Sequence, residues 1–101
     1  MTLTKAASLQ ELAVGGLAQR IVAGRKVLLV RLDGDVRAYE DRCAHLGLPL
    51  SGGRMDGTTL ICPAHEWEYD MTTGRGVNPA TVCLKSYPVK IEGDQILVDV
   101  E

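Results

Sequence analysis

The chain has 101 residues, 46% of them apolar, which suits a single globular domain over 1–101 with one core. Phenylalanine is absent, so the core must be built from Val, Leu and Ile. A net charge of −2 offers no basic face for nucleic acid. The longest uninterrupted apolar run, Val27 to Val30, is too short to cross a membrane. The first residues do not resemble a secretory signal, so we expect a soluble, cytoplasmic protein that is a monomer when free.

The first forty residues alternate short apolar segments with turns that contain Gly or Asp. Ser8 and Glu11 have the spacing of a capping box, which predicts one or two helical turns ending at Gly15-Gly16. The strands and turns that we expect next are a strand over 17–24, a tight turn at Gly24-Arg25, a strand over 26–32, a turn at 33–35 and a strand over 36–40.

The second half continues in the same manner after a region rich in Gly and Pro. An Asp56-Gly57 turn precedes a short strand that runs into Cys62, and a further strand over 66–70 ends in a turn. Residues 87–100 have the pattern of a hairpin with its turn at Gly93-Asp94. Many short strands at near-even spacing predict an all-β fold, an antiparallel sandwich or small barrel.

Two close pairs of Cys and His carry the chemistry. Cys43 and His45 are two apart, Cys62 and His65 are three apart, and sixteen residues separate His45 from Cys62. Three cysteines in all argue against a disulfide framework. Two thiolates and two imidazoles can fill one tetrahedral zinc site. They can also hold a [2Fe–2S] cluster, with the thiolates on one iron and the imidazoles on the other.

The region from Cys43 to Gly76 resembles the cluster-binding half of soluble Rieske ferredoxins, and the tail over 76–98 is also similar. It most resembles the ferredoxin component of bacterial multicomponent diiron monooxygenases. This resemblance implies a Rieske-like antiparallel β-sandwich with two cluster-binding loops, the cluster-binding subregion lying at about 41–80. It further implies one [2Fe–2S] cluster, to which each loop gives one ligand per iron. The residues that it places around the cluster are Leu46, Gly47, Pro63, Tyr69 and Pro79.

The same resemblance bears on the reduction potential. Respiratory Rieske proteins have a disulfide joining positions that here hold Leu48 and Ala64, and a serine where this chain has Trp67. Losing that hydroxyl donor favours the low end of the Rieske range. Tyr69 matches a tyrosine of high-potential members, so its hydroxyl is expected to raise the potential.

The resemblance implies a one-electron carrier between a flavin-containing NADH reductase and the hydroxylase of a diiron monooxygenase. A ferredoxin of an aromatic-ring dioxygenase is the alternative, and a zinc-binding interaction domain is a third. Catalysis is not expected, because an oxygenase needs a further iron site and both histidines of the chain are already committed.

Three further features have a functional and an ordinary interpretation. Glu66, Trp67 and Glu68 could form part of a negative patch that docks a partner. Trp67 could equally be a core residue, and the acids only a solvated strand face. Cys83 has no histidine nearby, which favours a buried, inert thiol.

Overall fold

The computed structural model describes residues 3–32, 34–42, 50–62, 67–78 and 83–100. The strands within these ranges are β1 (Thr4–Ser8), β2 (Leu17–Val22), β3 (Arg25–Leu32), β4 (Asp35–Glu40), β5 (Arg54–Asp56), β6 (Thr59–Ile61), β7 (Glu68–Asp70), β8 (Gly76–Asn78), β9 (Ser86–Tyr87), β10 (Val89–Glu92) and β11 (Gln95–Val98). Two single 3-10 turns accompany them, η1 (Leu9–Glu11) and η2 (Leu50–Gly52). Within the described part of the chain, no helix has the length and apolar character needed to cross a membrane.

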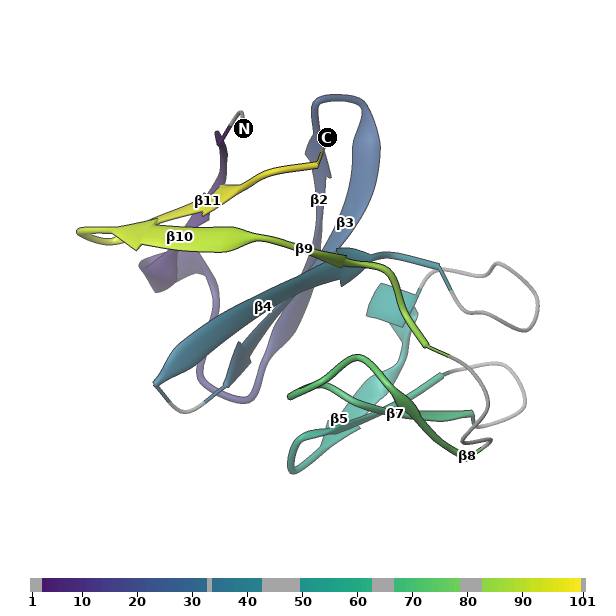
Figure 1. Ribbon diagram of the computed structural model, residues 1–101. Helices are drawn as coiled ribbons and strands as arrows, with labels where there is room; N and C mark the ends of the chain where they lie inside the picture. Colours follow the sequence, from purple (N-terminus) through teal and green to yellow (C-terminus); the bar gives the residue numbers. More distant parts are fainter. Residues whose placement is uncertain (1–2, 33, 43–49, 63–66, 79–82, 101) are drawn as a thin grey trace.

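The strands form three antiparallel sheets (Figure 1). The terminal sheet has the order β1-β11-β10, the central sheet β2-β3-β4-β9 and the insert sheet β5-β6-β7-β8. The insert sheet lies between β4 and β9 in the sequence and forms a layer of its own below the central sheet in Figure 1. The predicted all-β antiparallel fold is therefore confirmed.

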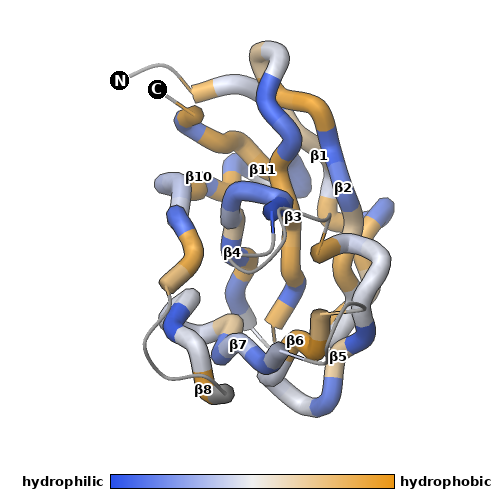
Figure 2. Tube along the Cα trace, turned by 90° about the vertical axis from the view of Figure 1, so that its right-hand side faces the viewer, coloured by the Kyte–Doolittle hydropathy of each residue, from blue (hydrophilic) through white to orange (hydrophobic). Residues whose placement is uncertain are grey.

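The central sheet is buried on both faces. Val27 and Leu29 pack into the core shared with the terminal sheet, whereas Leu28 and Val30 pack into the core shared with the insert sheet. All four side chains are fully buried. A strand covered on both faces needs no polar alternation, which explains the uninterrupted apolar run and the orange stretch along β3 in Figure 2.

Two of the predicted hairpin turns are displaced by one residue. Asp56 pairs with Thr59, so the turn between β5 and β6 is Gly57-Thr58 and not Asp56-Gly57. Val22 pairs with Arg25, so the turn between β2 and β3 is Ala23-Gly24 and not Gly24-Arg25. Both turn residues have positive φ, 50° and 81°, as a two-residue turn that matches strand twist requires. The predicted turn at Gly93-Asp94 is confirmed by the pairing of Glu92 with Gln95.

The predicted helical start is a single 3-10 turn. The carboxylate of Glu11 accepts a hydrogen bond from the Ser8 N–H at 2.9 Å. The Arg31 guanidinium donates to the carbonyls of Leu9 and Leu12 at 2.8 and 2.9 Å, which ties this turn to β3. Strand β1 was not predicted, because its register is set by β11 at the other end of the chain.

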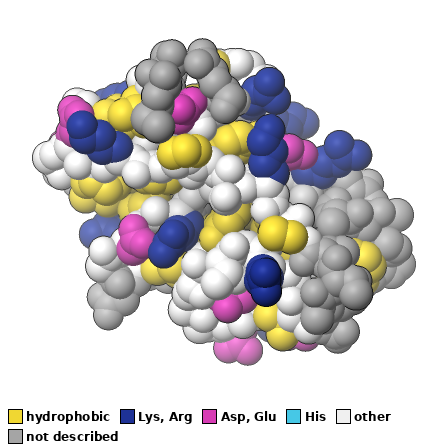
Figure 3. All heavy atoms as spheres, viewed as in Figure 1, with side chains coloured by type: hydrophobic (Ala, Val, Ile, Leu, Met, Phe, Trp, Pro, Cys, Tyr) yellow, Lys and Arg dark blue, Asp and Glu magenta, His cyan; other side chains and the backbone are white. Residues whose placement is uncertain are grey.

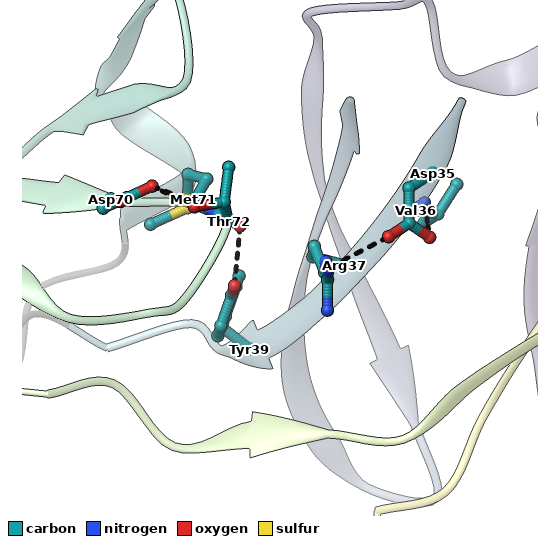
Figure 4. A network of polar contacts seen from close by, with 7 residues as sticks. All are labelled: Asp35, Val36, Arg37, Tyr39, Asp70, Met71 and Thr72. Carbon is teal, nitrogen blue, oxygen red and sulfur yellow. Dashed lines mark hydrogen bonds and ion pairs between the residues drawn. The ribbon is translucent and has the colours of Figure 1, made fainter. Parts of the chain in front are cut away.

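A buried tyrosine joins the insert sheet to the central sheet (Figure 4). Tyr39 on β4 donates its hydroxyl to the carbonyl of Met71 at 2.7 Å. Gly74 has a φ of +80°, and a Cβ there would lie 2.7 Å from Tyr39 Cε1. Only glycine therefore lets the turn after β7 close over the ring. Burial raises the pKa of Tyr39, so its hydroxyl stays a donor at neutral pH.

Candidate metal centre

Most of the predicted site lies outside the described residues. Cys62 is described and lies directly after β6, fully buried. The predicted site residues outside the described ranges are Cys43, His45, Leu46, Gly47, Pro63, His65, Glu66 and Pro79. No group of three or more metal-ligating side chains occurs among the residues that the structure does describe. The described residues that flank these segments, Asp41, Ser51, Gly53, Ile61, Cys62 and Trp67, are called the framework.

The framework brings the two ends of each ligand segment together. Asp41 precedes residues 43–49 and Ser51 follows them. The Asp41 carboxylate accepts from the N–H of Ser51 at 2.9 Å and from its hydroxyl at 2.8 Å. Cys62 precedes residues 63–66 and Trp67 follows them, and the Cys62 N–H donates to the Trp67 carbonyl at 2.7 Å. Both segments that carry a Cys–His pair are thus closed at their bases.

The two bases also adjoin each other. Arg54 pairs with Ile61 across β5 and β6, immediately before Cys62. A Cβ on Gly53 would lie only 2.3 Å from the Ile61 carbonyl oxygen, so the backbone here approaches as closely as glycine permits. The end of the first segment is thereby held against the start of the second.

Asp41 is the main polar anchor of this framework. Its side chain is only 4% exposed, and it accepts from Ser51 and from the side-chain amide of Gln19 on β2. A buried carboxylate is tolerated when donors surround it in this way. The role of Asp41 could not be predicted from the sequence, because its donors lie ten and twenty-two residues away and leave no local pattern.

Cys62 has surroundings that suit a metal ligand. It belongs to the apolar core that includes Leu50, Leu60 and Tyr69. A thiolate there would be costly by itself, because apolar surroundings disfavour charge. Binding to iron removes that cost, so the described donor fits a cluster built from thiolates and neutral imidazoles.

The neighbouring side chains divide between core and surface. Tyr69 is fully buried, and Trp67 is partly buried and packs against the same core. Glu68 and Asp70 are partly exposed, and Glu66 lies outside the described residues, so the solvated face formed by these three acids stays a prediction. Hydrogen bonds from the Thr72 hydroxyl and then from its N–H hold the pKa of Asp70 below its ordinary value of 3.8 (Figure 4).

A third segment, residues 79–82, also begins and ends beside this framework. Glu68 pairs with Asn78, and Arg75 forms an isolated bridge with Cys83. Gly76–Asn78, which lead into this segment, form strand β8. The prediction of a buried thiol at Cys83 was wrong: its side chain is exposed at the surface. Cys83 lies at this isolated bridge and belongs to neither of the two apolar cores.

Comparison with known proteins decides which kind of metal centre this is. Residues 2–88 match the family described as Rieske [2Fe-2S] domain. The chain belongs to this Rieske family. A Rieske domain carries a [2Fe–2S] cluster, so the iron–sulfur interpretation of the two Cys–His pairs is preferred over zinc.

Individual relatives agree with this family. The ferredoxin component of the alkene monooxygenase system of Xanthobacter autotrophicus is 44% identical over 82 residues, which span 79% of this Rieske chain and 66% of that protein. The ferredoxin of carbazole 1,9a-dioxygenase from Nocardioides aromaticivorans has a similar fold, with a TM-score of 0.91, 28% identity and full coverage of both chains. A complex of reduced oxygenase and oxidised ferredoxin in carbazole 1,9a-dioxygenase matches with a TM-score of 0.88 and 26% identity, over 98% of this chain and 94% of that one.

Proposed function

We propose that this protein is a one-electron carrier, the Rieske ferredoxin component of an oxygenase system. The observation that carries the proposal is the family match over residues 2–88 in a chain of 101 residues, together with relatives that are themselves ferredoxin components. In the described part of the chain, three sheets pack together, and the framework that flanks the predicted ligands lies at their edge.

The four ligands of the cluster are Cys43, His45, Cys62 and His65, with the two thiolates on one iron and the two imidazoles on the other. The closed bases of both segments and the buried position of Cys62 support this assignment. When bound, such a cluster supplies a neutral oxidised centre that accepts one electron more readily than a four-thiolate cluster. The protein's own residues fix the two segments, exclude water from Cys62 and present the histidine side to a partner.

The chain transfers electrons and does not oxidise the substrate itself. A Rieske oxygenase needs a second, mononuclear iron site with two more histidines and a carboxylate. This chain has two histidines in total, and the cluster uses both. The chain therefore acts between two partners, and we propose that it is cytoplasmic and a monomer when free.

The upstream partner is a flavin-containing NADH reductase, and the downstream partner is the hydroxylase of a multicomponent diiron monooxygenase. The 44% identity to an alkene monooxygenase ferredoxin supports that downstream assignment. The similarity in fold to a carbazole dioxygenase ferredoxin supports the second candidate, a ferredoxin that serves a ring-hydroxylating dioxygenase. Glu66, Trp67 and Glu68 are proposed as docking residues beside the cluster, Trp67 also packing into the core.

Single-turnover mixing separates the two candidates. The reduced holoprotein is mixed with an oxidised diiron hydroxylase and, separately, with an oxidised Rieske dioxygenase, and reoxidation is followed in the visible spectrum. Faster reoxidation by the hydroxylase supports the monooxygenase assignment. Faster reoxidation by the dioxygenase supports the second candidate. Failure with both would contradict an oxygenase function.

A further inference from the structure

Basic side chains gather at one end of the central sheet. Arg25 and Lys26 begin β3, Arg42 follows β4, and Lys85 precedes β9, and all four are exposed. These four cations, called the basic patch, lie around one carboxylate, that of Glu40. Figure 3 shows dark-blue side chains gathered around a magenta one at the upper right, over the end of β4 and the start of β3.

Backbone contacts place the basic patch residues at the same end of the central sheet. The Asp41 N–H donates to the Lys26 carbonyl at 3.1 Å, which places Lys26 beside the end of β4. The Glu40 N–H donates to the Lys85 carbonyl at 2.8 Å on the other side of the same strand. The basic patch therefore spans β3, β4 and the residues before β9.

Side-chain interactions around Tyr87 support the same arrangement. The Lys85 ammonium lies 5.4 Å from the centroid of the Tyr87 ring. Burial and then the Glu40 carboxylate raise the pKa of Tyr87, while Arg25 lowers it. Arg25, Glu40 and Lys85 thus lie within electrostatic reach of one residue.

Among the described residues, no ion pair neutralises the charge of the basic patch. Together with Glu40 it carries a net charge of +3, in a chain whose net charge is −2. The ion pairs among the described residues join Arg37 to Asp35 and Lys90 to Glu92, so none of the four cations is paired there. Unpaired cations grouped on a surface attract an oppositely charged partner and accelerate its encounter.

The basic patch adjoins the metal centre. Arg42 immediately precedes the predicted ligand Cys43. Arg42 and Lys85 also line a surface hollow together with Glu40, Cys83 and Leu84. A partner held here would contact Arg42, the residue that precedes Cys43 in the sequence.

We propose that the basic patch docks a carboxylate-rich face of the oxygenase component. This inference rests on the proposed function and names the surface through which it is exercised. The oxygenase is chosen over the reductase because a similar ferredoxin is found in complex with its oxygenase. The acids on β7 carry the opposite sign, so the two sides of the metal centre together fix the orientation of the bound partner.

Charge reversal tests the proposal in the full-length holoprotein. The double variant Arg25→Glu, Lys85→Glu reverses the two cations that lie around Tyr87. It is compared with Lys5→Glu, Lys90→Glu, which makes the same change of charge on the terminal sheet. Stopped-flow mixing of the reduced protein with oxidised oxygenase measures transfer at low and high salt. We expect the patch variant to be about tenfold slower at low salt and to lose the decline of the wild-type rate with rising salt. We expect the control variant to retain most of the wild-type rate.

Equal rates for the patch and control variants would overturn the proposal, as would slower reduction by the reductase with unchanged transfer to the oxygenase. Visible spectra of both variants confirm that the cluster is retained. If the wild type reduces no oxygenase, the proposed function fails together with the docking assignment. If only the patch effect is missing, the function stands without it.

Discussion

Replacing Asp41 by Ala removes the acceptor that closes the first ligand segment at its base. The buried carboxylate accepts from the Ser51 N–H, the Ser51 hydroxyl and the Gln19 amide. A hydrogen bond to a charged group contributes about 1.5–3 kcal/mol. Ser51 and Gln19 are half-buried and regain water when the carboxylate is lost, so we expect a net cost of about 2–4 kcal/mol.

This cost is expected in the rate at which the holoprotein loses its cluster. If the Asp41 contacts are broken when the segment opens, a cost of about 3 kcal/mol corresponds to roughly a 100-fold faster loss. The assay follows the visible absorption in the presence of an iron chelator. Asp41→Asn keeps one acceptor oxygen and should give an intermediate rate.

The matched control is Asp56→Asn, because Asp56 is an exposed carboxylate on β5 in the same sheet. A surface change of this kind is expected to have little effect. The reasoning would be refuted if Asp41→Ala lost its cluster no faster than Asp56→Asn, since the hydrogen bonds at the segment base would then not hold the metal centre.

Three further changes probe other parts of the account. Gly53→Ala places a Cβ against the Ile61 carbonyl oxygen, so we expect about 1–3 kcal/mol of destabilisation and faster cluster loss. Thr58→Ala in the nearby turn should leave the stability and the rate of cluster loss unchanged. Tyr69→Phe should lower the reduction potential measured by voltammetry, and an unchanged potential would remove the Tyr69 hydroxyl from the account. The pKa of Asp70 is lowered, so its contribution to stability is present above pH 3.8 and disappears as the pH falls through the lowered value. Thermal unfolding between neutral pH and about pH 2 should therefore show a shallower acid decline in Asp70→Asn than in the wild type.

The sequence predicted those features that short-range patterns encode. The apolar residues over 26–32 indicated a strand, which is observed as β3, and the Gly93-Asp94 hairpin follows from turn chemistry. The spacing of the Cys–His pairs was sufficient to indicate the Rieske family, which the match over residues 2–88 confirms. The assignment of individual ligands stays a prediction.

Features assembled from distant residues could not be predicted in this way. Asp41 is an anchor only because β2 and η2 bring donors to it. The exposed position of Cys83 depends on an isolated bridge to Arg75 rather than on a regular strand. The basic patch combines residues from three separate parts of the chain, and the overall charge of −2 conceals it.

Mössbauer spectroscopy of the holoprotein, labelled with a suitable iron isotope, tests the central claim most directly. The account predicts two inequivalent iron sites in equal amounts, one with thiolate and one with imidazole ligands. It also predicts that reduction by dithionite makes only the imidazole-bound iron ferrous. A single iron environment typical of four thiolates, or a protein that holds zinc and no iron, would contradict it.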